Sequence, residues 1–74
     1  MALQEMRKKA GLSQSELAAI SGVKLRTLQQ YESGARNING AKLDIICTLA
    51  LALNCKVYDI IEDEQLKIKL KKTV

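Results

Sequence analysis

The sequence predicts an all-α fold, a compact five-helix bundle in one domain with a short additional C-terminal tail. Hydrophobic residues make up 47% of the 74 residues but aromatic residues only 3%, so the core consists of Leu, Ile and Ala, which favour packed helices over sheets. The chain contains no proline, a residue that interrupts helices. The apolar residues recur three and four positions apart, which is the spacing of one helix face. A chain of this length forms a single domain and leaves little room for a deep enzyme pocket.

The first two helices are expected at the N-terminal end. A first helix covers residues 3–10, where apolar positions are separated by charged ones, and Gly11 ends it. Ser13 has the character of an N-cap, and Glu16 stands three residues later as its capping-box partner. A short second helix therefore follows Ser13.

A tight turn separates the second helix from a third. Gly22 can adopt the positive φ angle that such a turn requires. We expect the third helix over residues 25–33, with Leu28 and Tyr31 buried. The Ser-Gly pair after this helix ends it.

The longest apolar pattern of the chain predicts a fourth helix. It covers residues 41–53, with Asn39 as the best N-cap. Because residues 45–53 are apolar nearly all round, this helix is expected to lie against several others at once. A short fifth helix is predicted over residues 57–61.

The C-terminal tail has two possible structures. Leu66 and Leu70 suit a helix capped by Asp63, whereas the alternation of apolar residues with lysines suits a strand. We therefore divide the chain into a domain, residues 1–62, and a basic tail, residues 63–74.

The composition argues against an enzyme and against a metal site. The chain has no histidine, the commonest general base and metal ligand. Cys47 and Cys55 are too few for a disulfide framework, and we interpret both as reduced thiols packed as small hydrophobic residues. No catalytic set, cofactor or metal ligand is predicted. The longest apolar stretch falls short of the ~18 residues of a membrane span, so we expect no membrane association and a cytoplasmic location.

Two short helices joined by a glycine turn have the geometry of a DNA-reading helix-turn-helix. The segments GLSQSELAAISGV and RTLQQYESG resemble the core of the phage-repressor-like, or XRE-type, helix-turn-helix family. The segment NINGAKLDIICTLALALNCKVYDII is similar to the fourth and fifth helices of that family. The resemblance covers residues 3–61 and implies a DNA-binding function.

The resemblance implies roles for particular residues. The base-reading candidates lie on the exposed face of the third helix, where Arg and Gln can read guanine and adenine and an apolar side chain can contact a thymine methyl. They are Leu25, Arg26, Gln29 and Gln30.

The phosphate-contacting candidates flank that helix. Gln14 matches a family glutamine at the start of the second helix, and Lys24 replaces the usual capping Ser or Thr with a cation. The remaining candidates follow the third helix: Arg36, Asn37, Asn39 and Lys42. Between residues 24 and 42 there are four basic residues and a single acidic one, Glu32, so the net positive charge of the chain, +4, is concentrated on this side.

The resemblance also implies a structural ion pair between Arg7 and Glu32. We assign this pair to stability, because removing one partner leaves the other charge desolvated.

These observations predict a sequence-specific double-stranded DNA-binding transcriptional regulator, with repression as the expected effect. One small domain binds few bases, which argues for a homodimer on an operator. The expected dimer surface is the fifth helix and the tail, through Ile60, Leu66, Ile68 and Leu70, although the tail lysines could instead follow the DNA backbone. The alternative is an antitoxin-like or accessory protein-interaction module that holds a protein partner through the tail.

Overall fold

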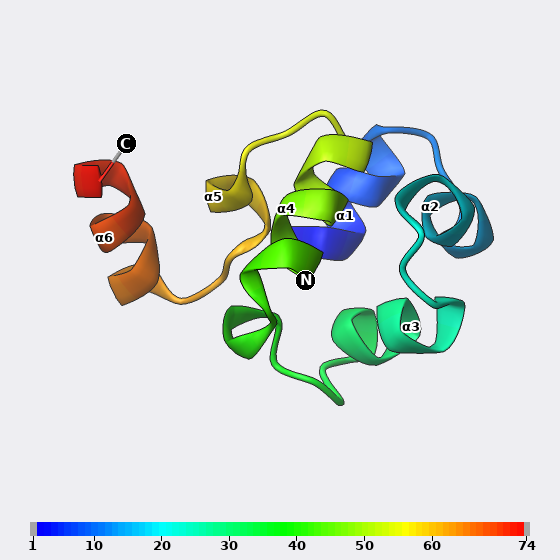
Figure 1. The fold of residues 1–74 in the computed structure, drawn as a ribbon, viewed down its shortest axis with the longest axis horizontal. Helices are drawn as coiled ribbons and strands as arrows, with labels where there is room; N and C mark the ends of the chain where they lie inside the picture. The colour runs from blue at the N-terminus through cyan, green and yellow to red at the C-terminus, as the bar shows by residue number, and fades with distance from the viewer. Residues whose placement is uncertain (1, 74) are drawn as a thin grey trace.

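The part of the chain that the structure describes folds into six α-helices and one short 3-10 helix and contains no strand (Figure 1). The computed structural model describes the backbone of residues 2–73 and the side chains of residues 2–72. Met1 and Val74, which the predicted domain and tail include, lie outside the described residues. The predicted all-α bundle is therefore confirmed, and the tail adopts the helical one of its two alternatives.

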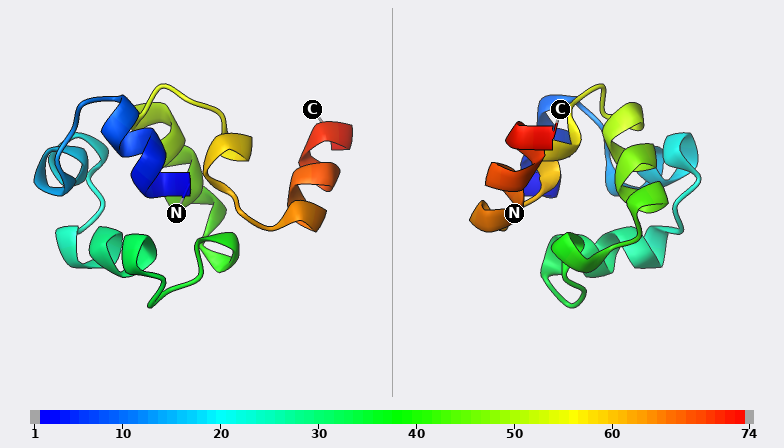
Figure 2. Two further views of the ribbon diagram at one scale, coloured as in Figure 1. Left: turned by 180° about the vertical axis from the view of Figure 1, so that it is seen from behind. Right: turned by 60° about the vertical axis from the view of Figure 1, so that its left-hand side comes forward.

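The helices form a bundle with the helix-turn-helix at one end and the C-terminal helix at the other (Figures 1 and 2). In chain order they are α1 (Ala2–Lys9), α2 (Gln14–Ser21), α3 (Leu25–Ser33), the 3-10 helix η1 (Ile38–Gly40), α4 (Leu43–Ala52), α5 (Val57–Ile60) and α6 (Glu64–Thr73). Both α1 and α4 lie between these ends, and α4 packs against α2 and α5.

The start of α2 is fixed by the capping box that the sequence predicts. The Ser13 hydroxyl accepts a hydrogen bond from the Glu16 backbone N–H at 3.0 Å, and the Glu16 carboxylate accepts one from the Ser13 N–H at 2.9 Å. Hydrogen bonding of the Glu16 carboxylate, first to the Ser13 backbone N–H and second to the Ser13 side chain, lowers the pKa of Glu16. The box therefore holds the carboxylate in its charged form at the helix N-terminus.

The core consists of one cluster of aliphatic side chains and one tyrosine. Its buried hydrophobic residues are Leu3, Leu17, Leu28, Tyr31, Ile38, Ile46, Leu49, Ala50, Leu53, Ile60 and Ile61. Ile60 is fully buried, so its assignment to a dimer surface is wrong. As the last residue of α5, it seals the core against α1 and α4.

The predicted start of the fourth helix is also wrong. Asn39 does not cap α4, because it lies inside η1, and α4 begins at Leu43 after an N-cap position occupied by Lys42. The Asn39 side-chain oxygen instead accepts hydrogen bonds from the backbone N–H groups of Glu62 and Asp63, at 2.9 and 3.1 Å. Asn39 therefore ties η1 to the segment that links α5 and α6.

As expected, α4 lies against more than one helix, since it packs on α2 and α5, but one of its sides is not covered. Ile46, Leu49 and Ala50 are buried, whereas Leu43 and Leu51 are 70% and 83% exposed. Cys47 lies on the exposed side, so its predicted packing is wrong. Cys55 is half-buried, and burial, followed by the charge of Asp59, raises the pKa of its thiol.

The tail helix α6 packs against α5 and extends from the end of the bundle. The Asp63 carboxylate accepts hydrogen bonds from the backbone N–H groups of Gln65 and Leu66, which begins the helix. Leu66 and Leu70 pack partly against the core, and Ile68 is 49% exposed. The lysine side of α6 covers an aromatic ring, since the ammonium groups of Lys67 and Lys71 each lie 5.3 Å from the centroid of the Tyr58 ring.

Candidate nucleic-acid interface

A three-residue connection joins α2 to α3 and turns the chain between them. Gly22 adopts φ 78°, a left-handed conformation that other residues rarely tolerate, and its N–H donates to the Ala18 carbonyl at 2.9 Å. Leu17 and Leu28 are fully buried between the two helices and the rest of the core. The two helices are therefore held as one unit, with α3 at the surface (Figure 1).

The two sides of α3 differ sharply in burial and chemistry. Leu28, Tyr31 and Glu32 are buried, while Arg26 and Gln29 are exposed. Two further base-reading candidates are partly covered: Leu25 is 38% exposed and Gln30 is half-buried. The first turns of α3 thus present one apolar, one guanidinium and one amide side chain to solvent, which are groups that can contact base edges.

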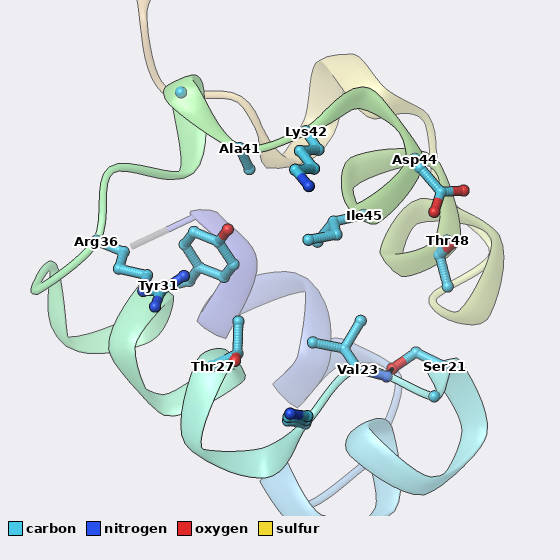
Figure 3. A pocket seen from close by; sticks show the side chains of 13 residues that line it. Ser21, Val23, Thr27, Tyr31, Arg36, Ala41, Lys42, Asp44, Ile45 and Thr48 are labelled. Carbon is cyan, nitrogen blue, oxygen red and sulfur yellow. Dashed lines mark hydrogen bonds between the residues drawn. The ribbon is translucent and has the colours of Figure 1, made fainter.

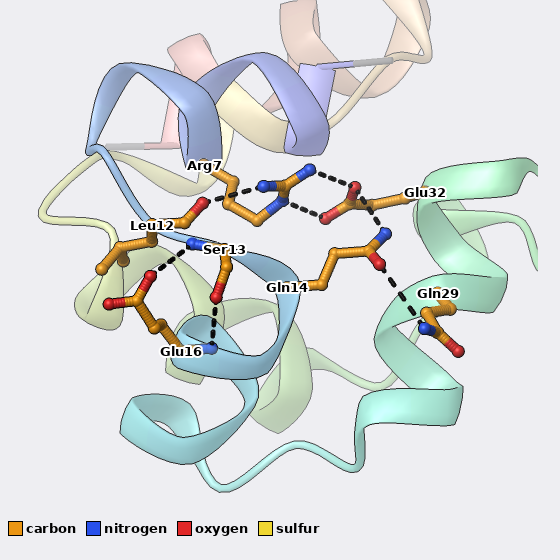
Figure 4. Close-up of polar contacts among 7 residues, drawn as sticks. All are labelled: Arg7, Leu12, Ser13, Gln14, Glu16, Gln29 and Glu32. Atoms are coloured by element: carbon orange, nitrogen blue, oxygen red, sulfur yellow. Dashed lines mark hydrogen bonds and ion pairs between the residues drawn. The ribbon is translucent and has the colours of Figure 1, made fainter.

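A buried ion pair connects α1 to the C-terminal end of α3 (Figure 4). The Arg7 Nε donates to one Glu32 oxygen at 2.8 Å and Nη2 donates to the other at 3.0 Å, while Nη1 donates to the Leu12 carbonyl at 2.8 Å. The two side chains are only 10% and 3% exposed. Because the pair is bidentate and desolvated, it fixes the orientation of α3 relative to α1.

The ion pair continues to the protein surface through two glutamines. Gln14 Nε2 donates to Glu32 Oε1 at 3.1 Å, and Gln29 Nε2 donates to Gln14 Oε1 at 3.5 Å (Figure 4). The hydrogen bond between Gln14 and Glu32 orients the Gln14 amide so that its nitrogen faces the Glu32 carboxylate. Sequence reasoning placed Gln14 at the DNA backbone but missed its contact with Glu32, since the two residues lie 18 positions apart.

A groove of about 630 Å³ lies between the α2–α3 turn and the start of α4 (Figure 3). Its walls include three of the predicted phosphate contacts, Lys24, Arg36 and Lys42. Tyr31 and Ile45 lie between these walls, and Asp44 is the single acidic residue that lines the groove. Three cations around one groove favour an anion there.

Two helix N-termini meet this groove without a side-chain cap. Lys24 and Lys42 are the N-cap residues of α3 and α4, and neither side chain accepts a backbone hydrogen bond. The first N–H groups of these helices therefore carry the partial positive charge that attracts a phosphate. The first turn of α3 has no acidic residue, whereas that of α4 contains Asp44.

The two asparagines of this region already have structural hydrogen bonds. The Asn37 side-chain oxygen accepts the Asn39 N–H at 3.0 Å and so begins η1, and Asn39 holds the α5–α6 segment as described above. Their amide NH₂ groups are the parts that could donate to a phosphate.

A comparison with protein families supports this interpretation of the geometry. A family model described as helix-turn-helix, of the XRE type, matches residues 3–60, which span α1 to the end of α5. The chain belongs to this family. A search of curated proteins and a search of solved structures return no match. XRE-type helix-turn-helix domains bind DNA, and the chain is in this sense a DNA-binding protein of the transcription-regulator type.

Within residues 2–73, no group of His, Cys, Asp and Glu side chains is arranged to hold a metal ion. None of the described helices has the length and apolar character needed to cross a membrane.

Proposed function

We propose that this protein is a sequence-specific operator-binding repressor that acts as a homodimer and reads the major groove with α3. The observation that carries the proposal is the exposed side of α3, where Arg26 and Gln29 stand beside Leu25. Arg can donate two hydrogen bonds to guanine, and Gln can pair with adenine through both its donor and its acceptor. A repressor that acts by occupying its operator needs only to bind DNA and catalyses no reaction.

The groove beside α3 supports the backbone part of this binding. Lys24 and Lys42 would hold phosphates at the uncapped N-termini of α3 and α4, and Arg36 lines the same groove. Asn37 would add an amide donor. Gln14 and Asn39 are weaker phosphate ligands in this proposal, because each side chain is already hydrogen-bonded within the protein.

The number of base contacts supports two copies on one operator. A single α3 reaches few base pairs, so specificity requires two half-sites about 34 Å apart, one for each protomer.

The test is selection from a pool of random duplexes by the wild type, by Arg26→Ala and by Gln29→Ala. The wild type should enrich a symmetric motif, and each substitution should change letters at one position of each half-site. Lys69→Ala, on α6, is the matched control and should enrich the wild-type motif.

The alternative function predicts a different result. An antitoxin-like or accessory interaction module would use α6 to hold a protein partner and would not need the polar side of α3. Weak, unselective DNA binding that neither α3 substitution changes would favour that function and contradict the repressor.

A further inference from the structure

The uncovered side of α4 carries an apolar stripe that the DNA-binding site does not use. The stripe consists of Leu43, Cys47 and Leu51, which lie four residues apart along one exposed side of the helix, next to the buried residues. The two leucines are among the most exposed large hydrophobic side chains of the described residues, at 70% and 83%. In Figure 1, α4 lies in front of α1, and no other helix is drawn in front of it. Exposed leucines at helical spacing indicate an interaction surface.

The stripe is symmetric about its central residue. When two α4 helices cross antiparallel around a two-fold axis at Cys47, Leu43 of one copy faces Leu51 of the other, and the reverse contact is identical. An isologous interface requires this self-complementarity. The small thiol at the crossing point lets the two helices approach closely, and the two Cys47 side chains then meet at the axis.

Charge favours a second copy on this surface over the exposed side of α6. The molecule has a net charge of +4, so two copies repel each other wherever their lysines meet. No Lys or Arg occurs from residue 43 to residue 55, and Asp44 is the single charged residue of α4. By contrast, α6 carries Lys67, Lys69, Lys71 and Lys72 beside its exposed Ile68. The predicted dimer surface on α6 is therefore the less favourable one for identical chains.

We propose that the α4 stripe is the surface on which a second copy of this chain packs, with α4 antiparallel to its symmetry mate and Cys47 at the two-fold axis. The inference rests on the homodimer of the proposed function. An α4 helix of 10 residues is only about 15 Å long, so the contact buries less than the ~800 Å² per partner of a standard interface. The dimer is accordingly weak in free solution and becomes stable when two adjacent half-sites hold both copies.

Disulfide trapping tests the position of the axis. Cys55→Ser leaves Cys47 as the only cysteine, and mild oxidation of this variant should give a covalent dimer on a non-reducing gel. The matched control is the variant Cys47→Ser, Cys55→Ser, Ile68→Cys, which has its one thiol on α6 and should stay monomeric. Equal trapping of both variants, or trapping of the control alone, would overturn the proposal.

Sedimentation tests the surface without a covalent bond. Leu51→Lys should weaken dimerisation at least about tenfold, because it places an ammonium group against the apolar Leu43 side chain of the other copy. The far-ultraviolet circular dichroism should not change, since Leu51 is almost entirely solvated. Ile68→Lys on α6 should leave the dimer as in the wild type. A dimer that Leu51→Lys leaves intact and Ile68→Lys dissociates would assign the interface to α6 and contradict the proposal.

Binding to a single half-site separates this proposal from the proposed function. Leu51→Lys should bind one half-site duplex as the wild type does and lose only the cooperative gain on the full symmetric site. If the wild type selects no DNA motif, the proposed function fails, while trapping and sedimentation still decide the role of α4. A Leu51→Lys protein that keeps full cooperativity on the symmetric site would contradict the α4 interface alone.

Discussion

At the scale of single residues, the buried Arg7–Glu32 pair makes the fold sensitive to the loss of either partner. Both charges are buried, and their five hydrogen-bonding atoms have partners in Leu12, Gln14 or each other. Arg7→Ala leaves the Glu32 carboxylate desolvated, so we expect the free energy of unfolding to fall by about 3–5 kcal/mol. Urea denaturation followed by circular dichroism measures it.

The control for this prediction replaces both charges. Arg7→Met combined with Glu32→Leu leaves no unpaired charge and should recover most of the lost stability. An Arg7→Ala protein within about 0.5 kcal/mol of the wild type, the range of ordinary surface substitutions, would contradict the structural role.

The capping box at Ser13 and Glu16 predicts a dependence of stability on pH. Because folding lowers the pKa of Glu16, its contribution is present at pH values above the ordinary pKa of a glutamate and is lost as the pH falls through the lowered value. Chemical denaturation between pH 7 and pH 3 measures this loss. Glu16→Gln lacks the carboxylate and should show a shallower pH dependence. Identical pH profiles for the two proteins would exclude Glu16 as a source of the dependence.

Some features of the DNA-binding site can be predicted from the sequence residue by residue, and others cannot. The exposed positions of Arg26 and Gln29 follow from the helical spacing of Leu28 and Tyr31. The hydrogen bonds of Gln14 to Glu32, and of Asn39 to Glu62, join residues 18 and 23 positions apart. Local patterns carry no information on such pairs, so the sequence assigns Gln14 to DNA alone and Asn39 to DNA and to the cap of the fourth helix.

At the scale of elements, local signals located the first three helices but not the start of α4. The capping box and Gly22 act within a few residues, which is why the sequence predicts α2 and α3. The polar run before α4 hides η1, whose Ile38 is buried in the core. The only local sign of this 3-10 helix in the sequence is a single isoleucine between two asparagines. The exposed side of α4 could not be foreseen, because its residues are as apolar as the buried ones.

The tail helix gives a prediction at this scale. A chain ending at residue 63 keeps the contacts of Asn39 and the core of α1 to α5, and it loses the partly buried Leu66 and Leu70. We expect the same helical spectrum for the remaining helices and a free energy of unfolding lower by about 2 kcal/mol, about 1 kcal/mol for each half-buried leucine. Urea denaturation checks this value. A truncated chain that is unfolded in buffer would make α6 part of the domain rather than an addition to it.

At the scale of the whole molecule, the distribution of charge predicts how salt weakens DNA binding. Removing a cation that contacts a phosphate should reduce the slope of log K against log salt by about 0.9 for one protomer on a half-site. We expect this change for each of the three groove residues, in the variants Lys24→Ala, Arg36→Ala and Lys42→Ala, with the preferred motif unchanged. Anisotropy titrations over a range of salt concentrations measure the slopes.

The control for the salt prediction is again Lys69→Ala. Its slope should equal that of the wild type, because α6 lies at the end of the molecule opposite the helix-turn-helix (Figure 1). A reduced slope for Lys69→Ala together with unchanged slopes for the groove variants would assign the backbone contacts to the tail.

The reading of bases by α3 in the major groove can be tested at a single atom of the DNA. Replacing a guanine of the selected half-site by 7-deazaguanine removes N7, one of the two acceptors of a bidentate arginine. We predict that this replacement weakens binding of the wild type about tenfold or more and leaves the already weakened binding of Arg26→Ala unchanged. Equal losses for the two proteins at every guanine, or no loss for the wild type at any of them, would show that Arg26 of α3 does not read a guanine.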